Sequence, residues 1–327
     1  MIQRKRILVL GGGSGGVATA AELGRTLGEK HEIVLVDRSS RHVYMPALLM
    51  LMTGNRTSRD ITRDLDRMAR HNVRFIQSAI QGIDPEAQTV HLADGQINYD
   101  YLVISLGLQT HPEAIPGLQV GAQHAWELDA AERCRDALDE FRGGDIVVGL
   151  PPGTYRCPPA PYETLFQMDW FLNQRGIRKD SSIHFFSPNS EPTGPPDSVP
   201  VWLDTHARER GVDTHYGFNV QEIDADGRRV LGSDGQELRY DILFVVPPHR
   251  PAQVLLDSGL AGPAGVQVDP NTLTTQWEHV WAIGDGADFP GSKAGVVAHQ
   301  QAAVVAHNIA VRLGEADHEE RLKLHTT

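Results

Sequence analysis

The chain has 327 residues, a length that favours two domains over one. Its composition, 40% hydrophobic and 22% charged, is that of an ordinary globular protein, and the formal net charge of −12 argues against a nucleic-acid partner, because phosphate contacts need a basic face. Two cysteines, Cys134 and Cys157, exclude a disulfide-rich scaffold and a thiolate cluster for zinc or iron–sulfur.

The N-terminus has the positive charge of a signal peptide, but the apolar stretch that follows runs straight into a glycine loop without a cleavage site. We therefore expect this stretch to be the first strand of a cytoplasmic protein. No run of about 18 apolar residues is present, so we expect no transmembrane segment.

A strand–helix–strand unit is predicted at the front of the chain, with a buried strand at residues 6–10, a helix at 15–28 and a second strand at 32–37. Residues 57–71, rich in Arg and Asp, are predicted to form one exposed helix. Further strands are expected at 73–76, 80–84, 87–92 and 101–107.

A second strand–helix unit is predicted to be inserted between about residues 110 and 240. Its expected elements are helices at 129–142, 161–175 and 201–210, strands at 145–149 and 182–186, a loop at 188–200 and a strand pair near 215–238. Core strands at 241–246 and 280–284 follow, and the polar residues from Glu315 are expected to fray.

This order predicts an α/β fold with two Rossmann-like dinucleotide-binding domains, the second inserted into the first. We assign residues 1–109 and 241–314 to a discontinuous first domain, 110–240 to the second domain and 315–327 to a polar tail.

The glycine-rich turn after the first strand has the G-x-G-x-x-G spacing of a dinucleotide site. Gly11 permits the tight turn, Gly13 lets the backbone approach a pyrophosphate, and Gly16 lets the helix pack on the strand. Asp37 ends the second strand, where a carboxylate can hold ribose hydroxyls. The remaining residues predicted to line this site are Ser14, Gly15 and Arg38.

A later segment distinguishes FAD from NAD. The run from Thr275 through Gly284 and Asp285 to Asp288 resembles the second flavin motif of the two-dinucleotide-domain flavoprotein reductases. The resemblance implies that Asp285 contacts the ribityl chain of FAD. It also implies flavin contacts from Ser105 and Gly107 at a strand end, and from Lys293, Gly295 and His299 on or before a late helix. His299 facing the flavin and His299 in a packing role both remain open.

Cys157 stands in a proline-rich loop, just ahead of a predicted helix with Pro161 in its first turn. A helix N-terminus and the neighbouring Arg156 both favour a thiolate. Glu163, about one turn into the helix, is placed to carry a proton. The alternative is that Cys157 is a small packing residue, whereas the helical spacing around Cys134 indicates a buried, inert thiol.

The run from Tyr155 to Glu163 resembles the redox-cysteine loop of sulfide:quinone oxidoreductases and flavocytochrome c sulfide dehydrogenases. Tyr44-Met-Pro46 resembles the segment by which those enzymes line the flavin, and it also resembles type II NADH dehydrogenases. Two prolines, Pro151 and Pro152, remove backbone donors that a second phosphate site would need, which disfavours NAD(P)H there.

The chain departs from these families in three ways. No cysteine follows Cys157, the region after the flavin helix is short, and His42 or Val43 occupies the position that resembles the covalent flavin cysteine. We therefore expect non-covalent FAD, and we expect that sulfur leaves to an external acceptor. The short region after the flavin helix argues against membrane docking and quinone reduction. The sequence contains no C-x-x-C-H motif for haem attachment.

The leading hypothesis is an FAD-dependent oxidoreductase acting on sulfide or a persulfide, with Cys157 carrying a persulfide or forming an adduct with the flavin. The electron acceptor, a quinone or a cytochrome, is left open, and a homodimer is possible. An FAD-dependent NADH dehydrogenase is the second hypothesis, and a non-catalytic flavoprotein subunit or sulfur-binding module is the third. The scattered histidines predict no metal site.

Overall fold

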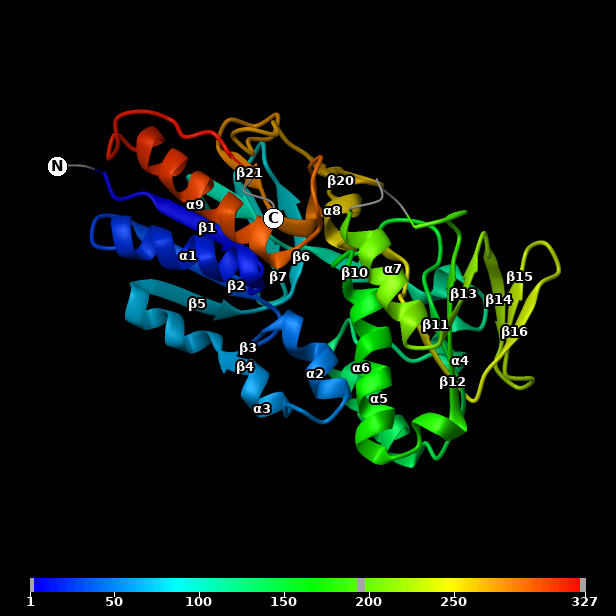
Figure 1. Ribbon diagram of the computed structural model, residues 1–327. Coiled ribbons are helices and arrows are strands. Elements are labelled where there is room, and N and C mark those ends of the chain that lie inside the picture. The colour runs from blue at the N-terminus through cyan, green and yellow to red at the C-terminus, as the bar shows by residue number, and fades with distance from the viewer. Residues whose placement is uncertain (1–2, 193–197, 324–327) are drawn as a thin grey trace. The chain divides into compact units, whose positions relative to one another are not determined.

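The computed structural model describes residues 3–192 and 198–323 and forms two compact units. Unit 1 comprises residues 1–43, 62–109 and 250–327, and unit 2 comprises 44–61 and 110–249. These boundaries differ from those predicted from the sequence, because residues 44–61 and 241–249 belong to unit 2. Figure 1 labels helices and strands of both units where there is room.

Unit 1 is built on a five-stranded parallel sheet in the order β21-β9-β1-β2-β5. Ile7 in the central strand is in register with Ile33 on one side and Tyr101 on the other. The inner strands are continuous apolar runs because both faces of the sheet are covered. The five strands are β1 (Arg6–Leu10), β2 (Glu32–Asp37), β5 (Val73–Gln77), β9 (Tyr101–Ile104) and β21 (Val280–Ala282).

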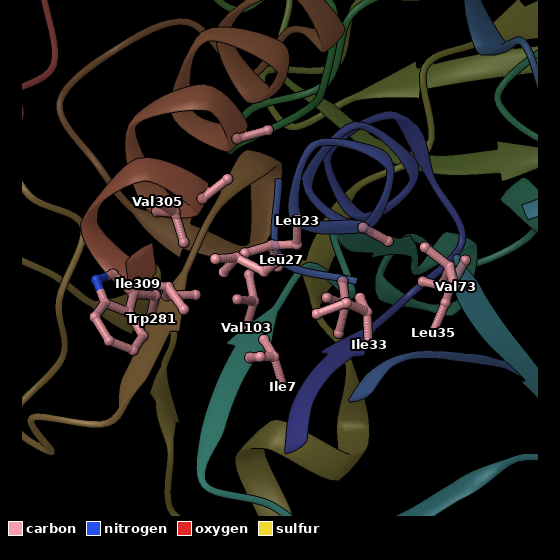
Figure 2. Packing of buried hydrophobic residues seen from close by; sticks show 14 of the residues in the cluster. Ile7, Leu23, Leu27, Ile33, Leu35, Val73, Val103, Trp281, Val305 and Ile309 are labelled. Carbon is pink, nitrogen blue, oxygen red and sulfur yellow. The ribbon is translucent and has the colours of Figure 1, made fainter. Parts of the chain in front are cut away.

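Two long helices, α1 (Ser14–Leu27) and α9 (Gly295–Arg312), lie side by side on one face of this sheet (Figure 1). Figure 2 shows the resulting core, in which side chains of both helices meet the strand residues of the same face. Its members include Ile7, Leu23, Leu27, Ile33, Val103, Trp281, Val305 and Ile309. Alternation along a strand turns the neighbouring residues, such as Leu8 and Leu10, into the core of the opposite face.

The opposite face is covered by a three-stranded antiparallel sheet, β6 (Ile80–Asp84), β7 (Thr89–Leu92) and β8 (Gly95–Asn98), and by the short helix α8 (Gln253–Asp257). Unit 1 therefore has three layers. Its smaller elements are β3 (Arg41–Val43), β4 (Thr62–Asp64), η2 (Leu65–His71), β19 (Ala261–Gly262), β20 (Gly265–Gln267), η5 (Gly284–Gly286) and β22 (Ala287–Asp288).

The single exposed helix predicted at residues 57–71 is wrong. The segment forms a four-residue helix, α3 (Ser58–Ile61), then β4 and the 3-10 helix η2. The helix stops because β4 pairs antiparallel with β3, and Leu65 and Met68 turn into the core. The Arg- and Asp-rich composition concealed this local pairing.

The fraying predicted from Glu315 is wrong for residues 315–323. The amide of the buried Asn308 on α9 donates to the Glu320 carbonyl at 3.0 Å and accepts from the Glu320 N–H at 2.7 Å. The Leu322 N–H donates to the Asn271 carbonyl at 2.7 Å. Residues 324–327, and residues 193–197 of the predicted 188–200 loop, lie outside the described residues.

Unit 2 repeats the layout on a smaller scale. Its parallel sheet has the order β13-β12-β11-β17, and Ile146 in β11 is in register with Ile183 and Ile242. The strands are β11 (Gly144–Gly149), β12 (Ser181–Ser187), β13 (Val212–Tyr216) and β17 (Ile242–Val245). The longer helices are α5 (Leu128–Glu140), α6 (Ala160–Arg175) and α7 (Val199–Glu209). The predicted α/β fold with two Rossmann-like units is confirmed.

A three-stranded antiparallel sheet completes unit 2 in place of the predicted strand pair: β14 (Val220–Asp224), β15 (Arg229–Gly232) and β16 (Glu237–Arg239). The remaining short elements are η1 (Met45–Ala47), α2 (Leu48–Met52), η3 (Pro112–Ala114), α4 (Leu118–Gly121), η4 (Arg178–Asp180), and β10 (Leu108–Thr110) and β18 (His249–Pro251) at the unit boundaries. Among the described residues, no helix is long and apolar enough to cross a membrane.

Candidate functional site

The glycine loop, residues 11–16, connects β1 to α1 in unit 1 and requires glycine at its two ends. Gly11 has φ +102°, and a Cβ there would lie 2.3 Å from the Ser105 carbonyl oxygen. A Cβ on Gly16 would lie 1.8 Å from the Gly11 carbonyl oxygen. These contacts match the turn and the close helix packing that the sequence predicts for the two residues.

The middle of the glycine loop faces open space. A Cβ on Gly13 would meet no atom within 4 Å, and Gly13 is exposed as the N-cap of α1. No side chain caps α1, and its first turn contains no acidic residue. The start of α1 therefore offers backbone N–H groups and the positive end of the helix dipole to an anion, which suits a pyrophosphate.

Asp37 ends β2 beside the glycine loop. Its carboxylate accepts the Gly12 N–H at 2.6 Å and the Ser39 N–H at 2.7 Å, and both oxygens keep lone pairs that can accept ribose hydroxyls. Arg38 follows and is exposed. Sequence reasoning missed one contact here: His42 Nδ1 lies 2.8 Å from the Gly12 carbonyl oxygen. No motif signals it, because only the fold brings β3 to the loop.

Two further segments meet the glycine loop at the carboxyl edge of the sheet, since β21, β9 and β1 are parallel neighbours. Ser105 follows β9, and a Cβ on Gly15 would lie 2.7 Å from its hydroxyl oxygen. A Cβ on Gly286 would lie 2.7 Å from the Gly107 carbonyl oxygen. The structure therefore brings together the glycine loop, the Ser105–Gly107 segment and η5, which contains Asp285.

Gln301 on α9 supports η5 and was not predicted. Its side-chain oxygen accepts the Gly284 N–H at 2.7 Å, and the side chain is 1% exposed. Its amide nitrogen has no hydrogen-bond partner in the described part of the chain. A buried glutamine within an apolar helix carries no local sequence signal for this contact.

Lys293 lies on the approach to α9, near the predicted flavin residues. Its ammonium group donates to the Ala287 carbonyl at 2.5 Å. Burial lowers the pKa of Lys293, and the negative charges of Asp285 and Asp288 partly offset this effect. Helix α9 then begins at Gly295 without a side-chain cap, and His299 is exposed on it. The open helix ends, the Asp37 carboxylate and the glycine contacts fit a bound dinucleotide such as FAD.

The cysteine loop, residues 150–159, occupies the equivalent place in unit 2 between β11 and α6. Cys157 is half-buried and has φ +62°, a left-handed conformation that is uncommon for a residue other than glycine. The Ala160 N–H donates to the Cys157 carbonyl at 3.0 Å, and α6 begins there with Pro161 in its first turn. The predicted position of Cys157 just ahead of the helix is confirmed.

A buried tryptophan holds the residue before the cysteine. The Trp126 indole N–H donates to the Arg156 carbonyl at 3.1 Å, and the Arg156 guanidinium donates to the Trp126 carbonyl. This reciprocal pair fixes both the backbone and the side chain of Arg156. Trp126 is 7% exposed, and both hydrogen bonds are partly buried.

Two histidines that sequence reasoning did not select lie in the electrostatic environment of Arg156. Burial lowers the pKa of His249 to about 3, and the positive charge of Arg156 adds to the effect. Burial likewise lowers the pKa of His124 to about 4. Both rings are therefore neutral at neutral pH. His124 and His249 lie far from Cys157 in the sequence, so no motif spacing links them to the cysteine.

Glu163 and Cys134 complete the cysteine side. Glu163 is exposed by surface area, yet protein packed near its carboxyl group desolvates it and raises its pKa, which suits a group that exchanges protons. Cys134 is fully buried on α5, its thiol donates to the His124 carbonyl at 3.2 Å, and burial raises its pKa to about 12. Cys134 is the buried thiol that the sequence predicts, and its raised pKa disfavours the thiolate form.

The predicted site residues fall in both units. The residues from Gly11 to Arg38, together with Ser105, Gly107 and the segment from Gly284 to His299, belong to unit 1. Tyr44 and Pro46, at η1, belong to unit 2 with Cys157 and Glu163, and Tyr44 is 57% exposed. Their assignment to flavin contact stays a prediction.

Comparison with known proteins agrees with this geometry. The family model described as "Pyridine nucleotide-disulphide oxidoreductase" matches residues 5–149 and 190–305. The model described as "Sulfide dehydrogenase [flavocytochrome c] flavoprotein chain, central" matches residues 132–247, a segment that contains the cysteine loop.

Individual relatives point the same way. The mitochondrial sulfide:quinone oxidoreductase of Dictyostelium discoideum is 29% identical over 317 residues, covering 93% of this chain and 70% of the relative. The sulfide-quinone reductase of Aquifex aeolicus is 27% identical over 334 residues, covering 93% and 76%. The X-ray structure of the sulfide:quinone oxidoreductase from Aquifex aeolicus superposes with a TM-score of 0.85 at 26% identity, covering 96% of this chain and 78% of that one.

Proposed function

Because the chain belongs to the pyridine nucleotide-disulphide oxidoreductase family and is an FAD-dependent oxidoreductase, we propose that it oxidises sulfide or a persulfide through Cys157. The single observation that carries this proposal is the cysteine loop. The loop holds one half-buried thiol just ahead of α6. At the equivalent position in unit 1, the glycine loop instead offers backbone N–H groups at the start of α1. The names of the relatives support sulfide as the substrate.

The residues of the cysteine loop account for the thiol chemistry. The Cys157 thiolate and a hydrosulfide ion join in a sulfur–sulfur bond, which leaves a persulfide on Cys157 and releases two electrons. When bound, FAD supplies the acceptor for that electron pair. If Cys157 starts as a thiol, one proton must leave as well, and Glu163, with its raised pKa, is the group that we assign to take it.

The outer sulfur then has to leave Cys157. Cys134 is unsuited to attack the persulfide because its thiol is buried with a pKa of about 12. We propose an external thiolate instead. It takes the outer sulfur as its own persulfide and returns Cys157 to the thiolate form, so that charge and sulfur balance.

The electron acceptor is proposed to be a quinone, because the relatives that cover most of the chain are named for quinone reduction. A cytochrome is the alternative, supported by the match of residues 132–247 to the flavocytochrome model. Reoxidation of the reduced protein by a soluble quinone analogue and by cytochrome c, measured separately, distinguishes the two acceptors.

Anaerobic sulfide titration of the FAD-loaded protein tests the proposal. Sulfide is expected to bleach the flavin absorbance of the wild type, and Cys157→Ser is expected to slow bleaching by at least about a hundredfold, the scale on which loss of a covalent nucleophile acts. Cys134→Ser is the matched control and is expected to bleach at the wild-type rate. Equal bleaching in all three proteins would remove Cys157 from the reaction.

An FAD-dependent NADH dehydrogenase is the second candidate, because the segment from Tyr44 to Leu49 resembles type II NADH dehydrogenases. The loop after β11 speaks against it, since Pro151 and Pro152 lack the N–H groups that a phosphate cradle uses. Rapid bleaching by NADH that is unaffected by Cys157→Ser would favour this candidate.

A further inference from the structure

Cys157 is held in a conformation that its own side chain disfavours. Its φ of +62° lies in the left-handed region, where a Cβ crowds the backbone. Such a residue keeps this conformation only when the surrounding structure fixes it from both sides. The contacts on either side of Cys157 therefore decide how its thiol is presented.

The side before Cys157 is fixed by the Trp126–Arg156 hydrogen bonds described above. The side after it depends on the first turn of α6. The Ala160 N–H binds the Cys157 carbonyl, and the Thr164 hydroxyl donates to the Ala160 carbonyl at 2.8 Å. Whatever anchors this first turn also anchors the cysteine.

The first turn of α6 is anchored by three buried or half-buried polar side chains, Tyr162, Tyr216 and Asp204, which we call the tyrosine chain. Tyr162, in the first turn of α6, has its hydroxyl 2.9 Å from the hydroxyl of Tyr216 on β13. The Tyr216 hydroxyl donates to the Asp204 carboxylate on α7 at 2.7 Å. Arg208 donates to the other carboxylate oxygen at 2.9 Å, and Asp204 is 7% exposed. The chain thus ties α6 to a strand and to a second helix.

The direction of the hydrogen bonds in the tyrosine chain is determined by its chemistry. An ionised carboxylate only accepts, so the single hydroxyl proton of Tyr216 goes to Asp204. Tyr162 must then donate to the Tyr216 oxygen. Burial raises the pKa of Tyr216 and of Tyr162, so both phenols keep their protons at neutral pH. The anchor is therefore fully formed in the range where a thiolate reacts.

Tyr155 connects the tyrosine chain with the cysteine electrostatically. Burial raises the pKa of Tyr155 to about 12, and the charges of Tyr162 and Cys157 both contribute. The three groups therefore share one environment. Among the described residues, the charged and titratable groups in or beside the cysteine loop include Tyr155, Arg156, Tyr162, Glu163, His124 and His249.

We propose that Tyr162 and Tyr216 are positioning residues that hold the first turn of α6 so that Cys157 stays in its left-handed conformation as a reactive thiolate. This inference rests on the proposed function, because Tyr162 and Tyr216 serve the reaction only if the Cys157 thiolate takes part in it. Without the tyrosine chain, the loop relaxes, and Cys157 loses the fixed position ahead of the helix and beside Arg156 that favours its anion.

The test is the rate at which iodoacetamide alkylates Cys157 in the FAD-loaded full chain, measured across a range of pH. Cys134 does not compete, because it is buried and its pKa is about 12. Tyr216→Phe removes both hydrogen bonds of the tyrosine chain. We expect it to lower the alkylation rate near neutral pH about fivefold or more and to move the pH profile to higher pH.

Tyr240→Phe is the matched control, because the Tyr240 hydroxyl is buried in unit 2 without a hydrogen-bond partner in the described residues. It is expected to leave the pH profile unchanged. Tyr162→Phe is the second variant in case Tyr216→Phe fails to fold, and it is expected to shift the profile in the same direction by a smaller amount. An unchanged profile in the folded Tyr162 or Tyr216 variant would overturn the proposal.

This measurement uses neither sulfide nor flavin reduction. If the proposed function is wrong, Cys157→Ser leaves the rate of flavin bleaching by sulfide unchanged. If this inference is wrong, Tyr216→Phe and Tyr162→Phe leave the pH profile of Cys157 alkylation unchanged. The two failures are therefore distinguishable.

Discussion

The loop after β1 and the loop after β11 each join a buried parallel strand to a helix, yet they use opposite residues. The glycine loop presents bare backbone: Gly13 is exposed, and nothing caps α1. The cysteine loop contains four prolines, which remove backbone donors, and it presents one side chain, Cys157, in a strained conformation. The same scaffold thus offers N–H groups to an anion in one unit and a thiol in the other.

The contrast extends to what holds each loop. Close backbone contacts hold the glycine loop, such as that between Gly16 and the Gly11 carbonyl. Side chains from distant segments hold the cysteine loop, above all Trp126. We therefore expect substitutions for glycine to disrupt the first loop, and loss of side-chain donors to disrupt the second.

The largest effect is expected from breaking the glycine loop. In Gly16→Ala, the added Cβ would lie 1.8 Å from a backbone oxygen, so we expect loss of FAD and a free energy of unfolding lower by about 1–3 kcal/mol or more. In Gly13→Ala, the Cβ meets only open space, so stability should hold while FAD binding weakens. Flavin absorbance and urea unfolding measure both. Equal loss of stability in the two variants would contradict the assigned roles.

The half-buried His249, whose pKa is lowered by desolvation and by the charge of Arg156, makes the cysteine side sensitive to acid. The pKa of His249 is about 3 in the folded chain against an ordinary value of 6.5, so the unfolded chain binds more protons between these values. The stability that neutral His249 contributes is complete above pH 6.5 and is lost as the pH falls towards 3. His249→Gln is expected to reduce this acid-induced loss by roughly 1–3 kcal/mol.

Urea unfolding at several pH values measures this effect through the slope of stability against pH, which separates it from any constant cost of the substitution. An identical slope in wild type and His249→Gln would show that His249 titrates normally in the folded chain.

A smaller effect is expected from releasing the residue before the cysteine. Trp126→Phe keeps the aromatic packing but leaves the Arg156 carbonyl without its indole donor, which should lower the free energy of unfolding by about 1–2 kcal/mol. The alkylation rate of Cys157 should fall as well. Trp202→Phe is a suitable control because Trp202 is 55% exposed. Equal stability of the two variants would show that the hydrogen bond contributes nothing.

The smallest effect is expected at the second cysteine. Cys134→Ala should lower stability by at most about 1–2 kcal/mol, because it removes one small buried group. Flavin reduction by sulfide should proceed at the wild-type rate. A slower reaction in a stably folded Cys134→Ala protein would make Cys134 a partner of Cys157 after all.

The sequence predicted the features whose causes are local. Apolar runs marked the strands, the glycine spacing marked the turn between β1 and α1, and Pro161 marked the start of α6. It failed at residues 57–71, where the pairing of β3 with β4 overrides a helix-like composition, and at residues 315–323, where Asn308 draws a polar tail onto α9.

Most supporting contacts could not be predicted, because they join residues that are far apart in the sequence. Trp126 meets Arg156 across 30 positions of sequence, and Gln301 meets Gly284 across 17. Such pairs depend on how strands and helices stack. A single sequence states which residues are present but not which of them the fold brings together.

The most direct test of the account is to look for sulfur on Cys157. The FAD-loaded protein is treated anaerobically with sulfide, its persulfides are trapped by alkylation, and peptides are analysed by mass spectrometry. We predict that the peptide containing Cys157 gains the mass of one sulfur atom as the flavin is bleached, while the Cys134 peptide does not. Bleaching of the flavin without sulfur on Cys157 would contradict it.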